Sequence, residues 1–280
     1  MQRPIMGTEA LAGAELTRGQ LRWNYRAVHP DVYIAKNQKR TLYVNTYAAW
    51  LWTRRTGIIA GRAAAAMHGV YGMDASTPIE MIGPHIRHQR GVVMREERIG
   101  GDEVQSIGEL RVTTAARTAL DLGRHLPRDL AVQYLDQLAR AADLTEAAVA
   151  PLIERYRGAR GLPRARVALS LMDGGTRRQE ETRMRLLMHD FGLPAPRTNI
   201  ALTDGRDTTV IGMGWDDVKL GVSYFEPPRP GGCAAVQDLR HHELVARMGW
   251  TEMGFINSGH GRSVGYHVRN ELHRRRRQNR

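Results

Sequence analysis

The chain has 280 residues, of which 42% are hydrophobic and 25% are charged. This composition excludes a wholly disordered, collagen-like or coiled-coil protein, and the length predicts about two domains. The one cysteine, Cys233, excludes a disulfide scaffold and a cysteine-based zinc site. No apolar run reaches membrane-span length and no signal-peptide pattern opens the chain, so we expect a cytoplasmic protein without a membrane partner.

Charge is unevenly distributed along the chain, whose net charge is +12. Residues 1–100 carry 14 basic and 7 acidic residues, whereas residues 101–175 carry ten of each. Residues 176–280 carry 17 basic and 12 acidic residues, and five arginines among the last seven residues account for that excess. The positive charge therefore belongs to the N-terminal region and a C-terminal tail, which indicates a polyanionic partner, nucleic acid first.

The first 40 residues have the element order of a winged helix-turn-helix. Thr8 is expected to cap a short helix, and Thr17 with Gln20 forms a capping box for a second helix over residues 18–26. Residues 28–35 read as a strand pair broken at a turn. We therefore predict that residues 1–100 form a winged helix-turn-helix, antitoxin-like DNA-binding region.

Basic residues mark the predicted DNA contacts. Arg18, Arg22 and Arg26 recur every fourth residue, so on a helix they would share one face. The remaining predicted contacts are Lys36, Lys39, Arg40, Arg274, Arg275, Arg276 and Arg277. The alternatives are a solvated helix face for the first three and a disordered, solubilising end for the last four.

The middle of the chain reads as mixed structure followed by helices. Helices are predicted at 43–52 and 61–68, and short strands at 78–82, 91–94 and 110–112. After Thr113 the pattern is helical, with Thr113 or Thr114 capping one helix and Asp143 with Glu146 capping another. We predict that residues 101–175 form a helical linker domain.

A change of composition at Gly174–Gly175 predicts the next boundary. Residues 176–273 read as helix, three strands, helix, strand, helix, and residues 274–280 as a basic tail. The predicted fold class of the whole chain is therefore mixed α/β.

Several segments of this last region carry a family resemblance. The order ETRMRLL, GLPAPRT, a strand ending in MGW, and QDLRHHELVARMGW resembles the Vsr-like endonuclease domain, which has the restriction-endonuclease-like PD-(D/E)xK fold. Upstream, RAAAAMHG, RVTTAARTALDLGRHLP and RYRGARG resemble actinobacterial proteins with an AbiEi-type antitoxin region. The resemblance implies antitoxin-like transcriptional control, with double-stranded DNA, a cognate toxin and a second copy of the chain as expected partners.

The resemblance also implies which residues would hold a catalytic metal. The helix glutamate of the family falls on Glu181, but its two strand acids fall on Gly212 and Ser223. Glycine and serine cannot replace carboxylates as ligands for a hard cation. We therefore expect a nuclease-like fold that is catalytically degenerate, with no catalytic residue, no metal and no cofactor, although Asp238 and Arg240 match the family.

Besides DNA binding, the sequence leaves two other functions open: a metal-dependent endonuclease and a toxin-neutralising interaction protein. Asp217 and Lys219 match a D-x-K motif, with Asp207 or Asp204 upstream, and would make an endonuclease that requires Mg²⁺ or Mn²⁺. That motif is short enough to arise by chance, and aspartate is also common in turns. Glu226 is a further acid near the vacant strand position, and His241, His242 and Glu243 read as a solvated helix face. The third hypothesis is an interaction protein that neutralises a toxin.

Overall fold

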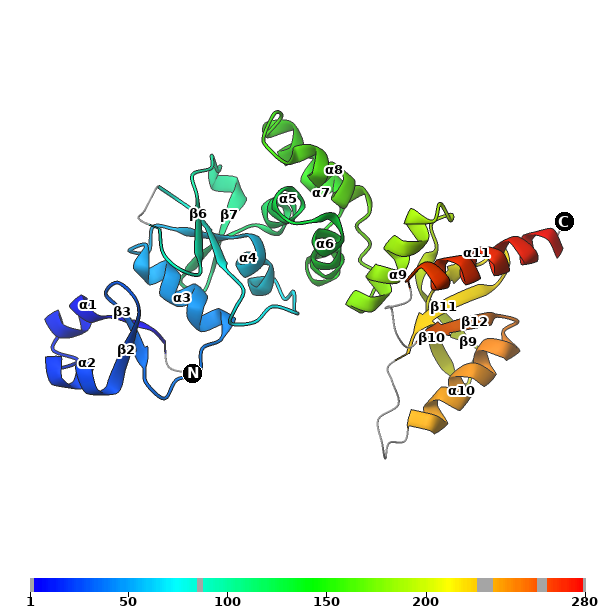
Figure 1. Cartoon of the computed structure of the whole chain (residues 1–280), viewed down its shortest axis with the longest axis horizontal. Helices are drawn as coiled ribbons and strands as arrows, with labels where there is room; N and C mark the ends of the chain where they lie inside the picture. Colours follow the sequence, from blue (N-terminus) through cyan, green and yellow to red (C-terminus); the bar gives the residue numbers. More distant parts are fainter. Residues whose placement is uncertain (1–2, 85–87, 226–233, 256–260, 279–280) are drawn as a thin grey trace. The chain divides into compact units, whose positions relative to one another are not determined.

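A computed structural model describes residues 3–84, 88–225, 234–255 and 261–278 (Figure 1), with the backbone alone at 234–238 and 261–262. Cys233 and Glu226, as well as the side chain of Asp238, lie outside the described residues. The chain forms two compact units, Met1–Ser170 and Leu171–Arg280. Both contain helices and sheets, so the mixed α/β class is confirmed. Within the described ranges, no helix has the length and apolar character needed to cross a bilayer.

The N-terminal part of the first unit is a pair of helices beside a small antiparallel sheet. The helices are α1 (Gly7–Ala12) and α2 (Arg18–Asn24), and the strands are β1 (Ile5–Met6), β2 (Tyr25–His29) and β3 (Val32–Ala35), in the order β1-β3-β2. The capping box of Thr17 and Gln20 is confirmed. The predicted cap at Thr8 is wrong, because Thr8 lies inside α1 and donates its N–H and hydroxyl to the carboxylate of Asp31, at 2.9 and 2.6 Å.

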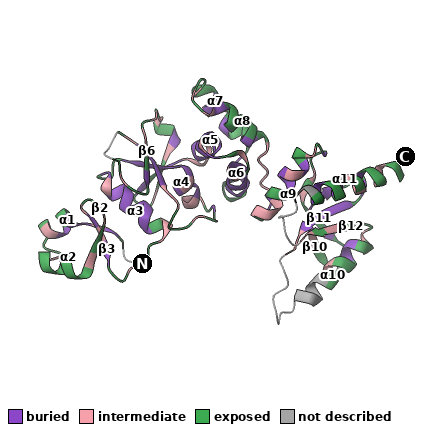
Figure 2. Ribbon diagram, in the orientation of Figure 1, coloured by how far each residue is buried: buried purple, intermediate pink, exposed green. Residues whose placement is uncertain are grey.

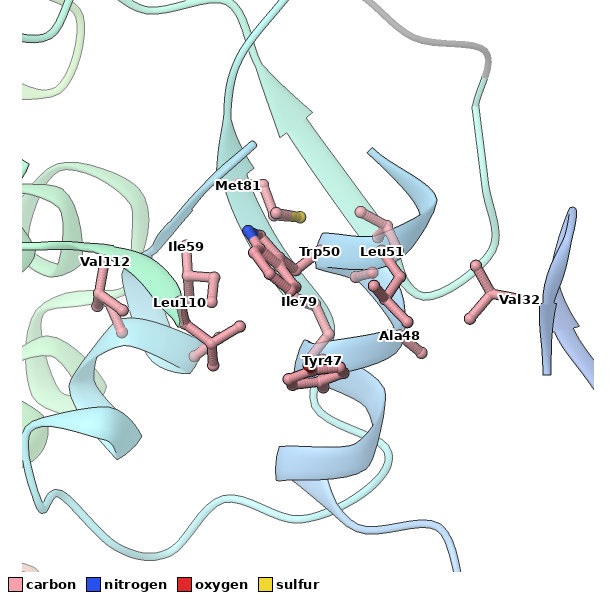
Figure 3. Close-up of a cluster of buried hydrophobic side chains, with 14 of the residues drawn as sticks. Val32, Tyr47, Ala48, Trp50, Leu51, Ile59, Ile79, Met81, Leu110 and Val112 are labelled. Carbon is pink, nitrogen blue, oxygen red and sulfur yellow. The ribbon is translucent and has the colours of Figure 1, made fainter. Parts of the chain in front are cut away.

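A five-stranded sheet forms the centre of the first unit. Its strands are β4 (Ile58–Ala60), β5 (Ile79–Ile82), β6 (Val92–Arg95), β7 (Val104–Ile107) and β8 (Leu110–Thr113), in the order β6-β5-β4-β8-β7. The helices α3 (Leu42–Trp52) and α4 (Gly61–Met67) precede and follow β4. Tyr47, Trp50 and Leu51 of α3 pack with Ile59 and Met81 of the sheet (Figure 3). Strand β4 was not predicted, since three residues are too few to show periodicity.

Four helices complete the first unit: α5 (Ala115–His125), α6 (Arg128–Ala142), α7 (Glu146–Arg155) and α8 (Leu162–Ser170). Because β7 and β8 belong to the five-stranded sheet, that sheet takes strands from both sides of residue 100. Thr114 caps α5 as predicted. The predicted cap at Asp143 is wrong: Thr145 caps α7 by accepting the N–H of Ala148, and Asp143 ends α6 with a positive φ of 48°.

The second unit is a four-stranded sheet with helices on both faces. Its elements are α9 (Gln179–Asp190), β9 (Arg197–Thr203), β10 (Thr208–Trp215), β11 (Leu220–Tyr224), α10 (Ala234–Arg247), β12 (Thr251–Phe255) and α11 (Gly261–Gln278). The order is β12-β11-β10-β9, and only the β11–β12 pair is parallel. One core lies between the sheet and α9 with α11, and a smaller one lies against α10 (Figure 1).

A buried arginine connects four segments of the first unit. The guanidinium of Arg117, on α5, is fully buried and donates to Asp121 (3.0 Å), Glu103 (2.6 Å) and Glu97 (2.9 Å). The same group donates to the hydroxyl of Tyr156 at 3.1 Å. Removing one member of such a network leaves buried charges without partners, which costs far more than losing a surface ion pair.

We expect Arg117→Ala to lower the free energy of unfolding of the first unit by about 3–5 kcal/mol, because it leaves buried carboxylates unpaired. Arg157→Ala is the matched control: Arg157 pairs with Glu154 at the surface, where its side chain is 80% exposed. That loss should stay below about 1 kcal/mol. Urea unfolding, monitored by hydrogen exchange of the α5 amides, measures the loss of unfolding free energy in each variant. Equal losses in Arg117→Ala and Arg157→Ala would contradict the role given to Arg117.

The same network makes stability depend on pH. Burial acts to raise the pKa of Glu97, but hydrogen bonds from His125 and Arg124 outweigh it and lower that pKa from 4.5 to about 2. The unfolded chain therefore binds this proton more tightly, and stabilisation that is complete above pH 4.5 is lost as the pH falls towards 2. Burial raises the pKa of Asp121 to about 6, so Asp121 acts in the opposite direction and at higher pH.

We expect Glu97→Gln to be less stable than the wild type at neutral pH but to lose less stability between pH 4.5 and 2. Unfolding free energies measured across this pH range for both proteins give the comparison. Parallel curves would show that Glu97 is not the group whose protonation weakens the fold.

Candidate functional site

The second unit contains a polar pocket of about 350 Å³ where the N-terminal end of α9 meets β10, β11 and α10. Arg177, Glu181, Gly212, Ser223 and His241 are among the residues that line it. Three of these, Glu181, Gly212 and Ser223, are the positions at which the resemblance expects metal-binding acids. The fold therefore brings together one residue each from α9, β10 and β11. Glu181 and Ser223, the first and last of the three, are 42 positions apart in the sequence.

The geometry around Gly212 shows how close these positions are. A Cβ atom on Gly212 would lie 3.4 Å from Oγ of Ser223 and 3.5 Å from Oε1 of Glu181. The strand is irregular here: Ile211 belongs to the core against α10, whereas Met213 belongs to the core against α9 and α11. Opposite this point Asn199 has a positive φ of 52°, so the usual alternation of faces is interrupted at Gly212.

The residues present do not fit a magnesium ion at these positions. Oε2 of Glu181 accepts the backbone N–H of Arg177 at 2.7 Å. The hydroxyl of Ser223 accepts the N–H of Gly212 at 2.9 Å and donates to Glu252. Mg²⁺ requires octahedral oxygen ligands, commonly carboxylates, and only one carboxylate stands among the three positions.

The alternative catalytic set is not assembled. Asp207 precedes β10 and pairs with Arg247 at 3.1 Å, whereas Asp217 follows β10 and pairs with Arg276 at 2.9 Å. The amino group of Lys219 donates to a backbone carbonyl at 3.0 Å. The eight residues of β10 separate the two aspartates by about 25 Å of strand. The structure therefore does not bring Asp207 together with Asp217 and Lys219.

Two side chains were not predicted from the sequence: His241, which lines the pocket, and Glu252, which contacts the lining residues Ser223 and His241. Glu252 lies on β12 with its side chain only 2% exposed, and its carboxylate accepts from the Ser223 hydroxyl and contacts Nε2 of His241. The prediction that His241 lies on a solvated helix face is wrong, since its side chain is 15% exposed. The available signal was strand alternation, because Glu252 shares a strand face with the buried Trp250.

A second candidate surface lies on α2. Figure 2 colours most of this helix as exposed; Arg18 and Arg22 are exposed, and Trp23 of the same helix is 73% exposed. Lys36 and Lys39, after β3, are exposed as well. In the part of the chain that the structure describes, none of these four cations has an ion-pair partner. We call Arg18, Arg22, Trp23, Lys36 and Lys39 the α2 surface.

Arg26 does not join this surface as predicted. Helix α2 ends at Asn24, and Arg26 lies on β2, because residues from Tyr25 onward pair with β3. Its guanidinium donates to the carbonyl of Gln38 at 2.9 Å. Arg40, also exposed, donates to the side chain of Asn45 at 2.9 Å. Pairing with a neighbouring strand has overridden the helical spacing of the arginines.

The acidic residues near the α2 surface are largely neutralised by arginines from outside it. The first 40 residues hold three acids, Glu9, Glu15 and Asp31. Arg55 pairs with Glu9 at 2.6 Å, and Arg54 pairs with Asp31 at 3.2 Å. The positive charge of the α2 surface is thus left with little local compensation.

Four C-terminal arginines, Arg274 to Arg277, continue α11 instead of forming a separate tail. Arg274 and Arg275 pair with Glu271 at 2.6 and 2.7 Å, and Arg276 pairs with Asp217. These three predicted DNA contacts therefore make ion pairs within the unit, while Arg277 is exposed.

Two curated relatives are known from Mycobacterium tuberculosis: the uncharacterized protein MT2308 of strain CDC 1551 / Oshkosh and the uncharacterized protein Rv2248 of strain ATCC 25618 / H37Rv. Each is 28% identical to this chain over 191 residues, which cover 67% of the chain and 70% of the relative. No family model and no solved structure matches the sequence. Neither relative's name states an activity.

We expect Gly212→Asp to create a weak magnesium site, because its carboxylate would project beside Glu181. Mg²⁺ at ten times its dissociation constant would stabilise the variant by about 1.4 kcal/mol. The melting temperatures of wild type and variant with and without Mg²⁺ measure this effect. Ser263→Asp adds the same charge at an exposed position of α11 and should show no such response. Equal responses in all three proteins would contradict the convergence of these positions.

Proposed function

We propose that this chain is a double-stranded-DNA-binding protein in which residues 3–40 act as a winged helix-turn-helix. The observation that carries the proposal is the α2 surface, where unpaired arginines stand beside an indole that is 73% exposed. The order of two helices followed by the β2–β3 hairpin supports the same assignment.

Charge supports contact with phosphates. Arg18 and Arg22 lie one turn apart on α2, and Lys36 and Lys39 follow the hairpin, so cations come from two neighbouring segments. Arginine and lysine neutralise phosphates and release counterions, which gives affinity without sequence preference. Glu9 and Asp31 do not offset them, because Arg55 and Arg54 already pair with these acids.

Trp23 distinguishes this surface from an ordinary solvated helix. A solvated face is built from charged and polar residues, and a tryptophan this exposed loses the benefit of burying a large apolar ring. Tryptophan combines an apolar face with an N–H donor, which suits an interface where sugars and base edges meet phosphates. We infer that Trp23 becomes buried when α2 meets its ligand.

We further propose that the second unit is a restriction-endonuclease-like domain that lacks the nuclease acids and serves as a second DNA-binding or dimerising platform. Its helix, three antiparallel strands, helix and parallel fourth strand support that fold assignment. The convergence of Glu181, Gly212 and Ser223 in one pocket supports the residue correspondence. Antitoxin-like transcriptional control, and a toxin partner, follow from the resemblance alone.

The test compares the salt dependence of DNA binding in the full chain. A labelled mixed-sequence duplex is titrated with wild type and with Arg18→Ala/Arg22→Ala, and fluorescence anisotropy gives the affinity at several salt concentrations. Each lost phosphate contact should lower the slope of log affinity against log salt by about 0.9, so the double variant should lose about 1.8.

The matched control is Arg157→Ala/Arg166→Ala, which removes two exposed arginines that pair with Glu154 elsewhere in the first unit. Its slope should equal that of the wild type. Binding that does not depend on salt, or equal slopes in both double variants, would refute the assignment of the α2 surface.

A further inference from the structure

We propose that His241, His242 and Glu252 form a binding site for a divalent transition metal, with Zn²⁺ as the preferred ion. This site is separate from the α2 surface and does not depend on the proposed DNA binding. It also differs in residues and in donor chemistry from Glu181, Gly212 and Ser223, the three positions at which the resemblance expects nuclease acids.

The three side chains converge on one carboxylate. One nitrogen or oxygen from each residue lies within 4.8 Å of the other two. Nε2 of His241 contacts Oε2 of Glu252, and Nδ1 of His242 lies 4.0 Å from the same oxygen. Although the histidines are adjacent on α10, both rings pack against Phe225, with centroid distances of 5.8 and 5.6 Å.

Burial of Glu252 is the argument for a cation. Its side chain is 2% exposed, and a buried carboxylate is costly unless a positive group compensates it. Among the residues that the structure describes, no lysine or arginine lies within 4.0 Å of it, and its ion-pair partners are the two imidazoles. A metal ion bound by all three groups would place a positive charge directly on this buried carboxylate.

The donor set selects the metal. Two imidazole nitrogens and one carboxylate oxygen suit Zn²⁺, which takes three protein ligands in open sites and leaves a fourth position for water. Mg²⁺ prefers oxygen ligands in an octahedron. Ligand atoms about 2.1 Å from a tetrahedral ion lie about 3.4 Å from each other. Metal binding therefore requires the 4.0 Å separation at His242 to close slightly and the hydrogen bond between His241 and Glu252 to open.

Neighbouring hydroxyl groups already orient the ligands. Thr209 Oγ1 is hydrogen-bonded to Nδ1 of His241, so Nε2 is the ring nitrogen directed at Glu252. The hydroxyl of Ser223 donates to Oε1 of Glu252, so Oε2 is the oxygen directed at the two histidines. Partners of this kind fix the tautomer and orientation of metal ligands in known sites. Ser223, which cannot replace a nuclease acid, gains a role in positioning Glu252.

A second cluster of potential metal ligands differs because arginine side chains already neutralise its carboxylates. Glu97, Asp121 and His125 also lie within coordinating distance of one another. Arg117 and Arg124, however, already donate to Glu97 at 2.9 and 2.7 Å, so guanidinium groups fill the place that a metal would take. No arginine plays this part at Glu252 among the described residues.

The test measures Zn²⁺ binding by the full chain in competition with a chromogenic chelator, and Co²⁺ substitution reports the geometry by its visible spectrum. We expect one Zn²⁺ per chain and a tetrahedral Co²⁺ spectrum. His242→Ala should weaken binding at least about 10-fold, and Thr209→Val, which keeps all three ligands, should weaken it by about 10- to 100-fold.

His189→Ala is the matched control, since its side chain is 57% exposed against 56% for His242 and it lies in the same unit. Its affinity should equal that of the wild type. Glu252→Gln should also weaken Zn²⁺ binding, but this buried substitution can impair folding. His242 is exposed, so His242→Ala tests the site even if Glu252→Gln does not fold. Absence of Zn²⁺ binding in the wild type, or equal binding by His242→Ala and His189→Ala, would overturn the site.

Discussion

Compensation of buried negative charge is the constraint on which the described parts of this structure depend. In the first unit three carboxylates surround the fully buried guanidinium of Arg117, which thereby joins α5 to the segments that hold Glu97, Glu103 and Tyr156. Since an unpaired buried carboxylate costs several kcal/mol, these groups can exist only together. In the second unit the buried carboxylate of Glu252 contacts imidazoles instead of a guanidinium, and we propose that a bound metal ion completes the compensation.

The pocket of the second unit brings together three positions that are distant in the sequence but hold only one carboxylate. Glu181, Gly212 and Ser223 face one another, but Glu181 accepts a backbone N–H near the start of its helix, and Ser223 holds Glu252 in place. The carboxylate next to Ser223 comes from the neighbouring strand. In the site we propose, this carboxylate stands with two imidazoles, a donor set that suits Zn²⁺ better than Mg²⁺.

Ion pairs within each unit also determine which arginines and lysines are available to contact a ligand. Arg54 and Arg55 pair with the acids beside α2, and Arg274, Arg275 and Arg276 pair within the second unit. The net charge of the chain is therefore a poor guide to its surface. What stays unpaired around α2 is a small group of cations next to Trp23, and we base the proposed DNA contact on that group.

The sequence by itself determined the mixed α/β class, most helix positions and the capping box at Thr17, because these depend on local periodicity and on side chains within one turn. Only the tertiary structure decided that Arg26 lies on a strand, that Asp207 and Asp217 lie at opposite ends of β10, and that Glu252 meets His241. Those outcomes depend on strand pairing and on contacts between residues distant in sequence, which no local pattern encodes.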